Sequence, residues 1–510
     1  MDNLSKVTKL LSEKETAVSG GGKDKIAQQH KAGKKTARER VAMLFDEGTF
    51  VETDTFLKNR NPLSGSSNYA DGVVAGYGTV DGRLVYCYSQ DYSVLSGTLG
   101  EMNAKKIVKI YDLALKTGAP VVAMLDCGGV RLEEGLDAIS AFGEIVARAS
   151  KLSGTVPQIA MVLGPCAGTM TVIPAVSDFT VMVDETASLY VNCKEVIKKE
   201  TEKSCDLFPG AEFSAKNGTV SLRAANEGEA FASVKKLLSY LPSNYLEDTY
   251  SEAPTDDINR ATPDIAGIIP NDEKSGFNMA DIIKSVADNC EFFEISKEFA
   301  KNMITGFVKL NGQTVGVVAN QPCEEDGIID SMGAKKAASF VGICDSFNIP
   351  ILTFTDSAGY KISIEEERWG LANAIGKLGM AFASADVPKV NVIVRKAYGG
   401  AYALMNSKQL GADFSYAFPT AVISAATPEI TMEMLHNDEI KKAVKPQEKR
   451  LEVLENIKEG EASAYAAAMR GFIDDIINPA DVRPVVVSAF DVLLTKRVDK
   501  AEKKHGNLPM

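Results

Sequence analysis

The stretch Met102-Asn103-Ala104-Lys105-Lys106 returns as Met332-Gly333-Ala334-Lys335-Lys336, at an offset of 230 residues (102 to 332). The stretch Asp126-Cys127-Gly128-Gly129 returns at the same offset as Asp356-Ser357-Ala358-Gly359. Solenoid repeats recur every 20–50 residues or so, and a period this long therefore indicates that each copy is a whole domain. We expect two related halves that superpose with the same strand order.

Strand and helix patterns alternate around these motifs. In the first copy, residues 98–116 predict a helix closed by Gly118, residues 135–152 a second helix, and residues 121–125 and 158–163 buried strands. The second copy predicts a helix from Met332, a strand over 351–355, a helix over 366–385 and a strand over 390–394. This alternation is typical of an α/β layer architecture with parallel strands.

Residues 1–48 predict a charged helical arm, in which Thr36 caps a helix that carries Glu39 in its first turn. Residues 204–262 are rich in Pro, Asn, Asp and Ser, and we place the junction between the halves there. The predicted organisation is an arm over 1–48, a first domain over 49–250 and a second over 251–510.

Composition excludes several classes of function. The chain has 510 residues, 45% of them apolar, and a net charge of −12, which argues against nucleic acid as a partner because phosphate binding needs clustered Lys and Arg. Its eight cysteines never form C-x-x-C, so we expect free thiols and no metal on this chain. We see no signal peptide and no run of about 18 apolar residues, and we expect a soluble, cytoplasmic protein.

Two glycine turns are the strongest candidates for chemistry. The turn centred on Gly168 returns at Gly399-Gly400, an offset of 231 (168 to 399), and each follows a strand and opens a helix. Backbone N–H groups at a helix start can hold a negative oxygen, as in an oxyanion hole worth about 3–4 kcal/mol per donor. The alternative is that these glycines only let helix and strand pack tightly.

Other catalytic groups are scarce. Neither G-x-G-x-x-G nor G-x-x-x-x-G-K-[ST] opens a helix. The three histidines, His30, His436 and His505, lie far from both turns in sequence, and we expect exposed roles for them. The chain would then contribute electrostatic stabilisation and leave proton transfer to a bound cofactor or substrate.

Six stretches carry a resemblance to a known family. They are His30-Lys31-Ala32-Gly33-Lys34-Lys35-Thr36-Ala37-Arg38-Glu39-Arg40, Gly164-Pro165-Cys166-Ala167-Gly168, Val315-Gly316-Val317-Val318-Ala319-Asn320-Gln321-Pro322, Val387-Pro388-Lys389-Val390, Arg395-Lys396-Ala397-Tyr398-Gly399-Gly400-Ala401-Tyr402 and Lys503-Lys504-His505-Gly506-Asn507. The chain resembles, over nearly its whole length, the carboxyltransferase subunits of biotin-dependent acyl-CoA carboxylases and decarboxylases. Propionyl-CoA carboxylase beta and methylmalonyl-CoA decarboxylase alpha subunits are the most similar types.

The resemblance implies two tandem crotonase-like ββα-superhelix domains of the ClpP/crotonase superfamily. The first would bind acyl-CoA and the second biotin, with the site between domains of different subunits in a hexamer. The amides of Gly168 and Thr169 would hold the thioester enolate oxygen, and those of Gly400 and Ala401 the ureido oxygen of biotin. Further substrate-binding residues implied by the resemblance are Gly129, Val130, Arg131, Met170, Gly359, Tyr360, Gly399, Tyr402 and Ala403.

The resemblance also implies partners. The chain has no biotinyl-lysine Met-Lys-Met motif, so biotin would arrive on a separate biotin carboxyl carrier protein or subunit. A carboxylase would work with a biotin carboxylase, whereas a decarboxylase would work with a membrane pump. The residues themselves leave the direction of reaction open.

Some positions depart from the family pattern. Thr169 and Met170 stand where relatives have Gly-Ala, and Thr169 would be strained by about 1–3 kcal/mol if that position required a positive φ. Ala403 replaces an Asp, Asn192-Cys193-Lys194 replaces Thr-Gly-Pro, and residues 357–363 lack the usual prolines. These departures indicate an atypical acyl substrate or a decayed site.

Three functions follow from these observations. The first is carboxyl transfer between biotin and an acyl-CoA, with propionyl-CoA and methylmalonyl-CoA as the expected pair. The second is a degenerate structural or regulatory subunit of such a complex. The third is a crotonase-type hydratase or hydrolase that acts on CoA thioesters without biotin, against which the stretch 396–402 argues.

Overall fold

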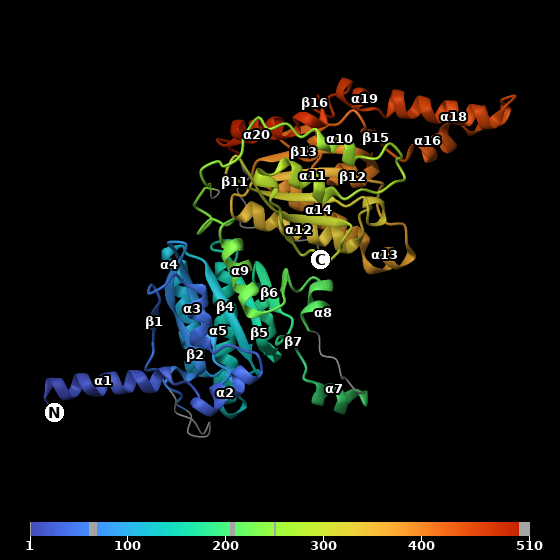
Figure 1. Ribbon diagram of the computed structural model, residues 1–510. Coiled ribbons are helices and arrows are strands. Elements are labelled where there is room, and N and C mark those ends of the chain that lie inside the picture. Colours follow the sequence, from blue (N-terminus) through green and yellow to red (C-terminus); the bar gives the residue numbers. More distant parts are fainter. Residues whose placement is uncertain (1, 61–68, 204–209, 249–250, 499–510) are drawn as a thin grey trace. The chain divides into compact units, whose positions relative to one another are not determined.

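The computed structural model describes residues 2–60, 69–203, 210–248 and 251–498 (Figure 1). The chain separates into two compact units, Met1–Asp248 and Thr249–Met510. Each unit is an α/β fold built on one mixed sheet. No helix within the described ranges is both long and apolar enough to cross a bilayer.

The first unit orders its strands β1-β2-β3-β4-β5-β6-β8, and β7 pairs with β5. β1 and β2 pair antiparallel, as do β2 and β3, and the remaining pairs are parallel. The strands are β1 Val51–Thr53, β2 Val73–Val80, β3 Arg83–Gln90, β4 Val121–Cys127, β5 Gln158–Ala167, β6 Phe179–Val183, β7 Ser188–Tyr190 and β8 Leu222–Ala224. The helices are α1 Asn3–Val18, α2 Lys23–Lys31, α3 Ala37–Leu44, α4 Glu101–Thr117, α5 Leu136–Leu152, α6 Val172–Val176, α7 Lys194–Thr201, α8 Ala211–Lys216 and α9 Glu227–Leu238.

The second unit repeats this topology strand for strand, with the order β9-β10-β11-β12-β13-β14-β16 and β15 paired with β13. Its strands are β9 Phe293–Ile295, β10 Met303–Leu310, β11 Gln313–Asn320, β12 Ile351–Ser357, β13 Lys389–Tyr398, β14 Phe414–Ala417, β15 Val422–Ser424 and β16 Asp475–Ile476. Its helices are α10 Asp264–Ile268, α11 Met279–Val286, α12 Ser331–Ser346, α13 Ile364–Trp369, α14 Leu371–Ser384, α15 Gly399–Leu404, α16 Pro428–Leu435, α17 Asn437–Lys442, α18 Pro446–Asn456, α19 Ala464–Met469 and α20 Val482–Leu493. The expected shared strand order is confirmed.

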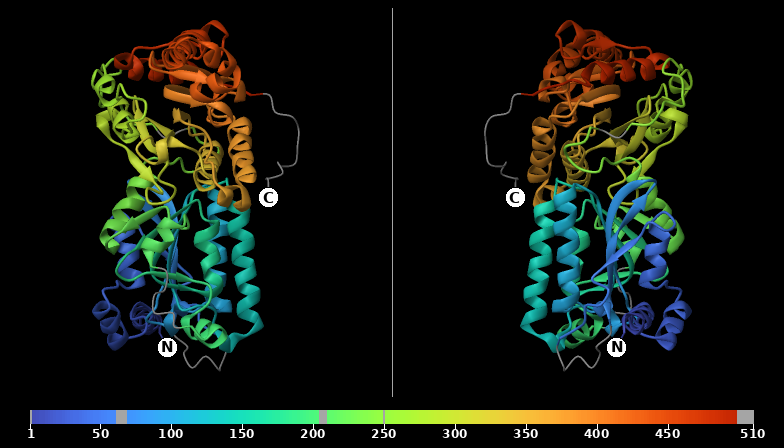
Figure 2. Two further views of the ribbon diagram at one scale, coloured as in Figure 1. Left: turned by 90° about the vertical axis from the view of Figure 1, so that its right-hand side faces the viewer. Right: turned by 90° about the vertical axis from the view of Figure 1, so that its left-hand side faces the viewer.

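Helices bury an apolar face against each sheet. In the second unit, α11 packs Met279, Ile282, Ile283 and Val286 into the core beside α20, at the spacing of one helical face. Helices α12 and α14 pack together in this unit, as α4 and α5 do in the first (Figure 2). The parallel strands read as continuous apolar runs because they are covered on both faces.

The repeated motifs make equivalent contacts in both units. The ammonium of Lys106 donates to the carbonyl of Val73, and that of Lys336 donates to the carbonyl of Met303 at 2.7 Å. Burial lowers the pKa of each lysine to about 8. The second lysine of each motif therefore serves the fold, because it satisfies a carbonyl at the start of β2 or β10.

Local sequence signals predict where several helices begin and end. Thr36 and Glu39 form a reciprocal capping box at the start of α3, and Gly118 ends α4 in the left-handed conformation with φ 66°. The single helix predicted over 366–385 is wrong, because Gly370, with φ 87°, divides it into α13 and α14. A helix cannot continue through a residue of positive φ.

Candidate active site

A bulge precedes the glycine turn in each unit. In the first, Leu125 lies opposite Val162 and Cys127 opposite Cys166, so residues 163–165 of β5 face the single residue Asp126 of β4. In the second, residues 394–396 of β13 face Asp356 in the same way. Each bulge carries a strand away from its neighbour just before the turn that holds the candidate donors.

The two turns have the same backbone geometry. Gly168 follows β5 and opens a short helical turn, and Gly399 follows β13 and opens α15. Both glycines have φ 62°, so the expected equivalence of the two turns is confirmed. The first N–H groups of a helical turn have no intrahelical acceptor, which leaves Thr169, Gly400 and Ala401 with donors to offer.

The condition for strain at Thr169 is not met. The positive φ of this turn lies on Gly168, whereas Thr169 has a negative φ that any residue adopts. The Thr169 hydroxyl is buried and has no partner among the described residues. Met170 is fully buried.

The loop after β4 holds Gly129, Val130 and Arg131. Gly129 has φ 114°, and its carbonyl accepts from the N–H of Leu99. Val130 is partly exposed. Arg131 is buried, and its guanidinium pairs with Asp71 at 2.9 Å and Glu134 at 2.6 Å, so these carboxylates hold the loop through Arg131.

The structure gathers most of the candidate residues of the second unit. Gly399, Gly400, Tyr402 and Ala403 line one cavity of about 600 Å³. The ring of Tyr360 lies where a Cβ on Gly400 would approach it to 3.0 Å, and Tyr360 lines an adjoining surface hollow of about 540 Å³. Gly359 precedes it with φ 130°. Burial raises the pKa of both Tyr360 and Tyr402 to about 12, so each keeps its phenolic proton at neutral pH.

An ion cluster lies beside the second turn, and all its members except Asp326 are buried. Asp356 is fully buried and accepts from Arg395 at 3.1 Å, and Lys396 pairs with Asp326. Burial raises the pKa of Asp356 to about 6, although Arg395 and Lys396 act to lower it. Sequence patterns do not reveal this cluster, because its members lie up to 70 residues apart.

Among the remaining reactive groups, the Cys166 thiol is buried in β5, two residues before Gly168. His30 pairs with Glu39 at 3.0 Å and His436 with Glu439 at 3.4 Å, both on the surface, and His505 is outside the described residues. Seven cysteines are free, and Cys205 is also outside the described residues. No group of three metal-ligating side chains occurs in the described part of the chain.

Known proteins match this chain over its whole length. Residues 28–508 match the carboxyl transferase domain family. A propionyl-CoA carboxylase carboxyltransferase subunit of Haloferax mediterranei is 41% identical over 99% of both chains, as is a methylmalonyl-CoA decarboxylase subunit alpha of Propionigenium modestum. A crystal structure of transcarboxylase 12S, described as a hexamer with methylmalonyl-CoA and methylmalonic acid bound, is 37% identical and covers 100% of this chain and 99% of its own, with a TM-score of 0.97.

These matches agree with the duplicated sheets and the paired turns. The expected fold, two tandem crotonase-like α/β domains, is confirmed by the transcarboxylase match. The resemblance carried by the six stretches is confirmed by the family match. The chain belongs to the carboxyl transferase domain family and is a carboxyltransferase.

Proposed function

We propose that this carboxyltransferase moves a carboxyl group between biotin on a separate carrier and an acyl-CoA, with propionyl-CoA and methylmalonyl-CoA as the pair. The names of the two relatives support this substrate pair, since one is a propionyl-CoA carboxylase subunit and the other a methylmalonyl-CoA decarboxylase subunit. The ligand in transcarboxylase 12S is of the same class.

The twin turns are the observation that carries the mechanism. Carboxylation or decarboxylation at the α-carbon of an acyl-CoA places negative charge on the thioester oxygen. The N–H groups around Gly168 and Thr169 would bind that oxygen. Removal of one donor would lower the rate by about 100-fold or more. The same φ of 62° at Gly399 gives the second unit an equivalent set of donors.

The cavity beside the second turn fits biotin. Biotin combines an apolar ring with a ureido group. The cavity is lined mainly by small and apolar side chains, with Glu461 and Arg470 also present, and Gly400 of the turn lies in its wall. The Tyr402 hydroxyl, buried without a partner among the described residues, is a further group for the ureido atoms. Bound biotin supplies a ureido nitrogen that carries the carboxyl group, and this chain orients it and excludes water.

The chain's own residues stabilise charge and do not shuttle protons. Tyr360 and Tyr402 hold their protons at neutral pH, and burial raises their pKa values further above the ordinary value. The two described histidines are surface residues paired with glutamates, so neither is placed to act as a base. Proton transfer would therefore run between the bound reactants.

We further propose that the first unit binds acyl-CoA, the second binds biotin, and the complete site needs two copies of the chain in a hexamer. The hexamer of transcarboxylase 12S supports this assembly. The remaining partners would be a biotin carboxyl carrier protein and either a biotin carboxylase or membrane pump subunits. The degenerate-subunit alternative loses one support, because Thr169 is not strained.

A transfer assay with free biotin tests the function. Purified chain is incubated with biotin and, separately, malonyl-CoA, methylmalonyl-CoA and ethylmalonyl-CoA, and carboxybiotin and decarboxylated thioester are both measured. We expect the two products in equal amounts, with the highest kcat/KM for methylmalonyl-CoA. Thioester hydrolysis without carboxybiotin would contradict the proposal and favour the biotin-independent alternative.

A further inference from the structure

Each unit buries one aspartate under its bulge. Asp126 is the last residue but one of β4, Asp356 holds the equivalent place in β12, and both residues are 0% exposed. A buried carboxylate is costly unless cations and hydrogen bonds compensate its charge. The two units obtain these cations from different parts of the chain.

The second unit takes its cations from its own bulge. Arg395 and Lys396 are bulge residues of β13, and both face Asp356, at 3.1 Å and 3.9 Å. Lys396 also pairs with Asp326. The cluster thus has two cations and two carboxylates, all within the second unit.

The first unit has no charge at the matching positions. Gly164 and Pro165 stand at the offset of 231 where Arg395 and Lys396 stand in the second unit, and Ser96 stands at the offset of 230 where Asp326 stands. Position 164 has no room for any side chain, because a Cβ there would lie 2.1 Å from Oδ1 of Asp126. The compensating cations must come from elsewhere.

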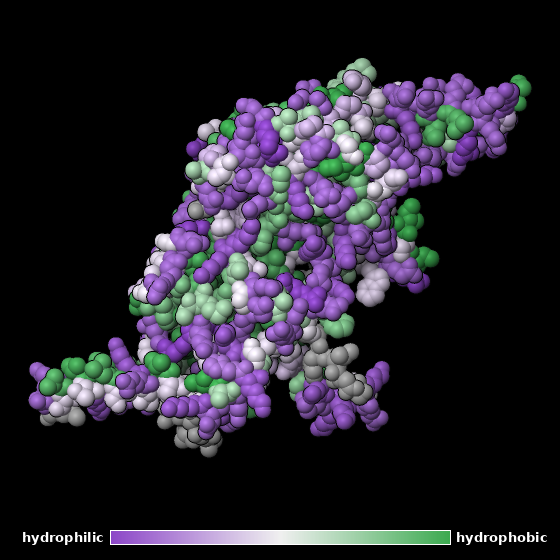
Figure 3. Space-filling view, in the orientation of Figure 1, coloured by the Kyte–Doolittle hydropathy of each residue, from purple (hydrophilic) through white to green (hydrophobic). Residues whose placement is uncertain are grey.

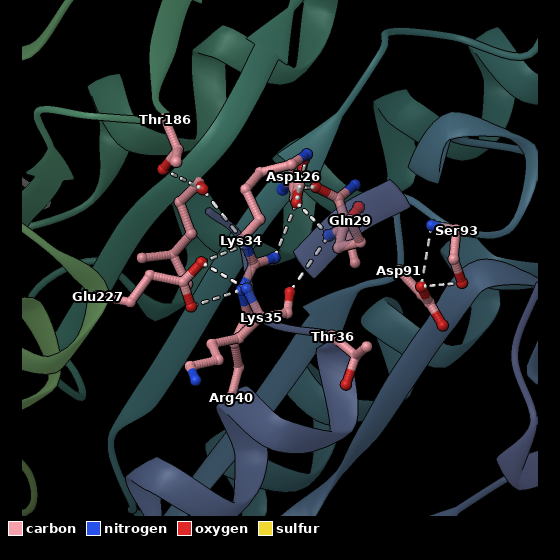
Figure 4. Close-up of polar contacts among 12 residues, drawn as sticks. Gln29, Lys34, Lys35, Thr36, Arg40, Asp91, Ser93, Asp126, Thr186 and Glu227 are labelled. Carbon is pink, nitrogen blue, oxygen red and sulfur yellow. Dashed lines mark hydrogen bonds and ion pairs between the residues drawn. The ribbon is translucent and has the colours of Figure 1, made fainter. Parts of the chain in front are cut away.

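Two residues of the N-terminal arm occupy this place (Figure 4). Lys34 donates to Oδ1 of Asp126 at 2.9 Å, and Arg40 donates to Oδ2 at 2.9 Å. Arg40 also pairs with Glu227 at 2.7 Å, which restores a cluster of two cations and two carboxylates. Burial lowers the pKa of Lys34, whereas Asp126 acts to raise it.

Arg40 also contacts the bulge backbone itself. Its Nη2 donates to the carbonyl of Leu163 at 3.2 Å, and the Thr186 hydroxyl donates to the same carbonyl at 3.0 Å. In the second unit the equivalent carbonyl, that of Val394, accepts a hydrogen bond from the Thr420 hydroxyl at 2.7 Å. The arm therefore fixes the strand segment that leads into the Gly168 turn.

We propose that Lys34 and Arg40 are positioning residues that the arm supplies to the first glycine turn, in place of the cations that the second unit carries in β13. This role rests on the proposed function of that turn as an oxyanion hole. The stretch 30–40 then has a function of its own, because it holds the bulge and the donors that follow it. Loss of the cations would displace these donors, and a displacement of about 1 Å is enough to cost about 100-fold in kcat.

The test compares Arg40→Met and Lys34→Met with matched controls in the same segment. Arg38→Met removes a partly exposed partner of Glu52 from the same helix, and Lys35→Met removes an exposed side chain next to Lys34. Amide hydrogen exchange is measured at 163–170 and at 394–401, together with kcat and KM for transfer. Arg40→Lys, which keeps the charge, is the rescue variant.

We expect Arg40→Met to speed exchange at 163–170 by about tenfold and leave 394–401 unchanged. The kcat of Arg40→Met should fall about 100-fold with little change in KM, and the kcat of Lys34→Met should fall less. Arg40→Lys should recover part of the activity that Arg40→Met loses. Both controls should match the wild type in exchange and in kcat.

Two outcomes would overturn the role. If Arg40→Met does not fold, Lys34→Met is used in its place. Unchanged exchange at 163–170 together with unchanged kcat in a folded variant would reject the proposal. Equal acceleration of exchange in both turns would also reject it, since that result indicates global destabilisation. If the wild type transfers nothing, the proposed function fails, whereas the exchange comparison still decides the positioning role.

Discussion

Gly168 and Gly399 each carry the positive φ of their turn, which leaves the next residue in ordinary backbone geometry. The family resemblance implies that Thr169 stands where relatives have glycine, but it does not show which of the two residues, Gly168 or Thr169, must be left-handed. That depends on the path of the chain out of the β5 bulge. A β-branched residue is therefore tolerated at position 169.

Thr169→Gly tests this conclusion. We expect a change in kcat of less than about threefold, because there is no strain to relieve, whereas relief of about 1–3 kcal/mol would change the rate or stability more. Steady-state transfer and thermal unfolding are measured on the variant and the wild type. A large gain in either quantity would show that position 169 is strained.

Asp356 gives a pH dependence of known sign. Burial raises the pKa of its carboxyl from 3.8 to about 6, so the folded chain binds this proton more tightly than the unfolded chain. The contribution of this carboxyl to the free energy of unfolding is therefore highest below pH 3.8 and falls by about 3 kcal/mol as the pH rises to 6.

Denaturation of the wild type and of Asp356→Asn at pH 4, 5, 6 and 7 measures this difference. The wild type should lose stability relative to the variant between pH 4 and 6 and run parallel to it above pH 7. A difference that does not vary with pH would contradict the raised pKa of Asp356.

At the level of helices and strands, local signals predict local structure. The caps at Thr36 and Gly118 follow from side-chain and backbone chemistry within one turn, and both are found as expected. The clusters around Asp126 and Asp356 were not predicted, because they join segments far apart in sequence. Lys34 and Arg40 lie in the stretch 30–40, which is one of the six that carry the family resemblance. Only the fold shows that both residues reach Asp126.

The repeated lysines give a paired prediction for α4 and α12. Lys106→Met and Lys336→Met should each lower the free energy of unfolding by about 1–3 kcal/mol, because each leaves buried carbonyls without a donor. Lys105→Met and Lys335→Met, which remove the exposed neighbours, should cost about 0.5 kcal/mol or less.

The same variants carry a pH signature. Because the folded-state pKa of about 8 lies below the ordinary 10.5, the stability difference between wild type and Lys336→Met should grow as the pH rises from 8 towards 10. Calorimetry at pH 8 and 10 follows this difference. A difference that shrinks with rising pH would contradict the lowered pKa.

For the chain as a whole, the sequence shows the duplication but does not show which apolar side chains are exposed to solvent. Leu132 and Ile362 occupy equivalent positions, as do Ile139 and Trp369, and all four are exposed. Apolar side chains also line the surface of α1, at Leu4, Val7 and Leu11 (Figure 3). Apolar surface of this extent is typical of a protein that associates with copies of itself or with partners.

Trp369 reports on this assembly, because it is the only tryptophan and is 77% exposed in the single chain. We expect its emission to be blue-shifted in the oligomer and to shift to the red on dilution, together with loss of transfer activity. Ile362→Lys should move this transition to higher protein concentration. A stable 54.7 kDa species in light scattering that still transfers carboxyl groups would overturn the oligomeric site.

The proposal that backbone N–H groups of the glycine turns stabilise the reaction is tested by the rate of carboxyl transfer from methylmalonyl-CoA to free biotin in Gly400→Pro and Gly400→Ala. Both variants place a Cβ about 3.0 Å from the ring of Tyr360, but only proline removes the N–H donor, at a helix start that tolerates it. We predict that Gly400→Pro folds and loses about 100-fold or more in kcat relative to Gly400→Ala. A folded Gly400→Pro that transfers as fast as Gly400→Ala would show that the N–H of residue 400 does not contribute to the reaction.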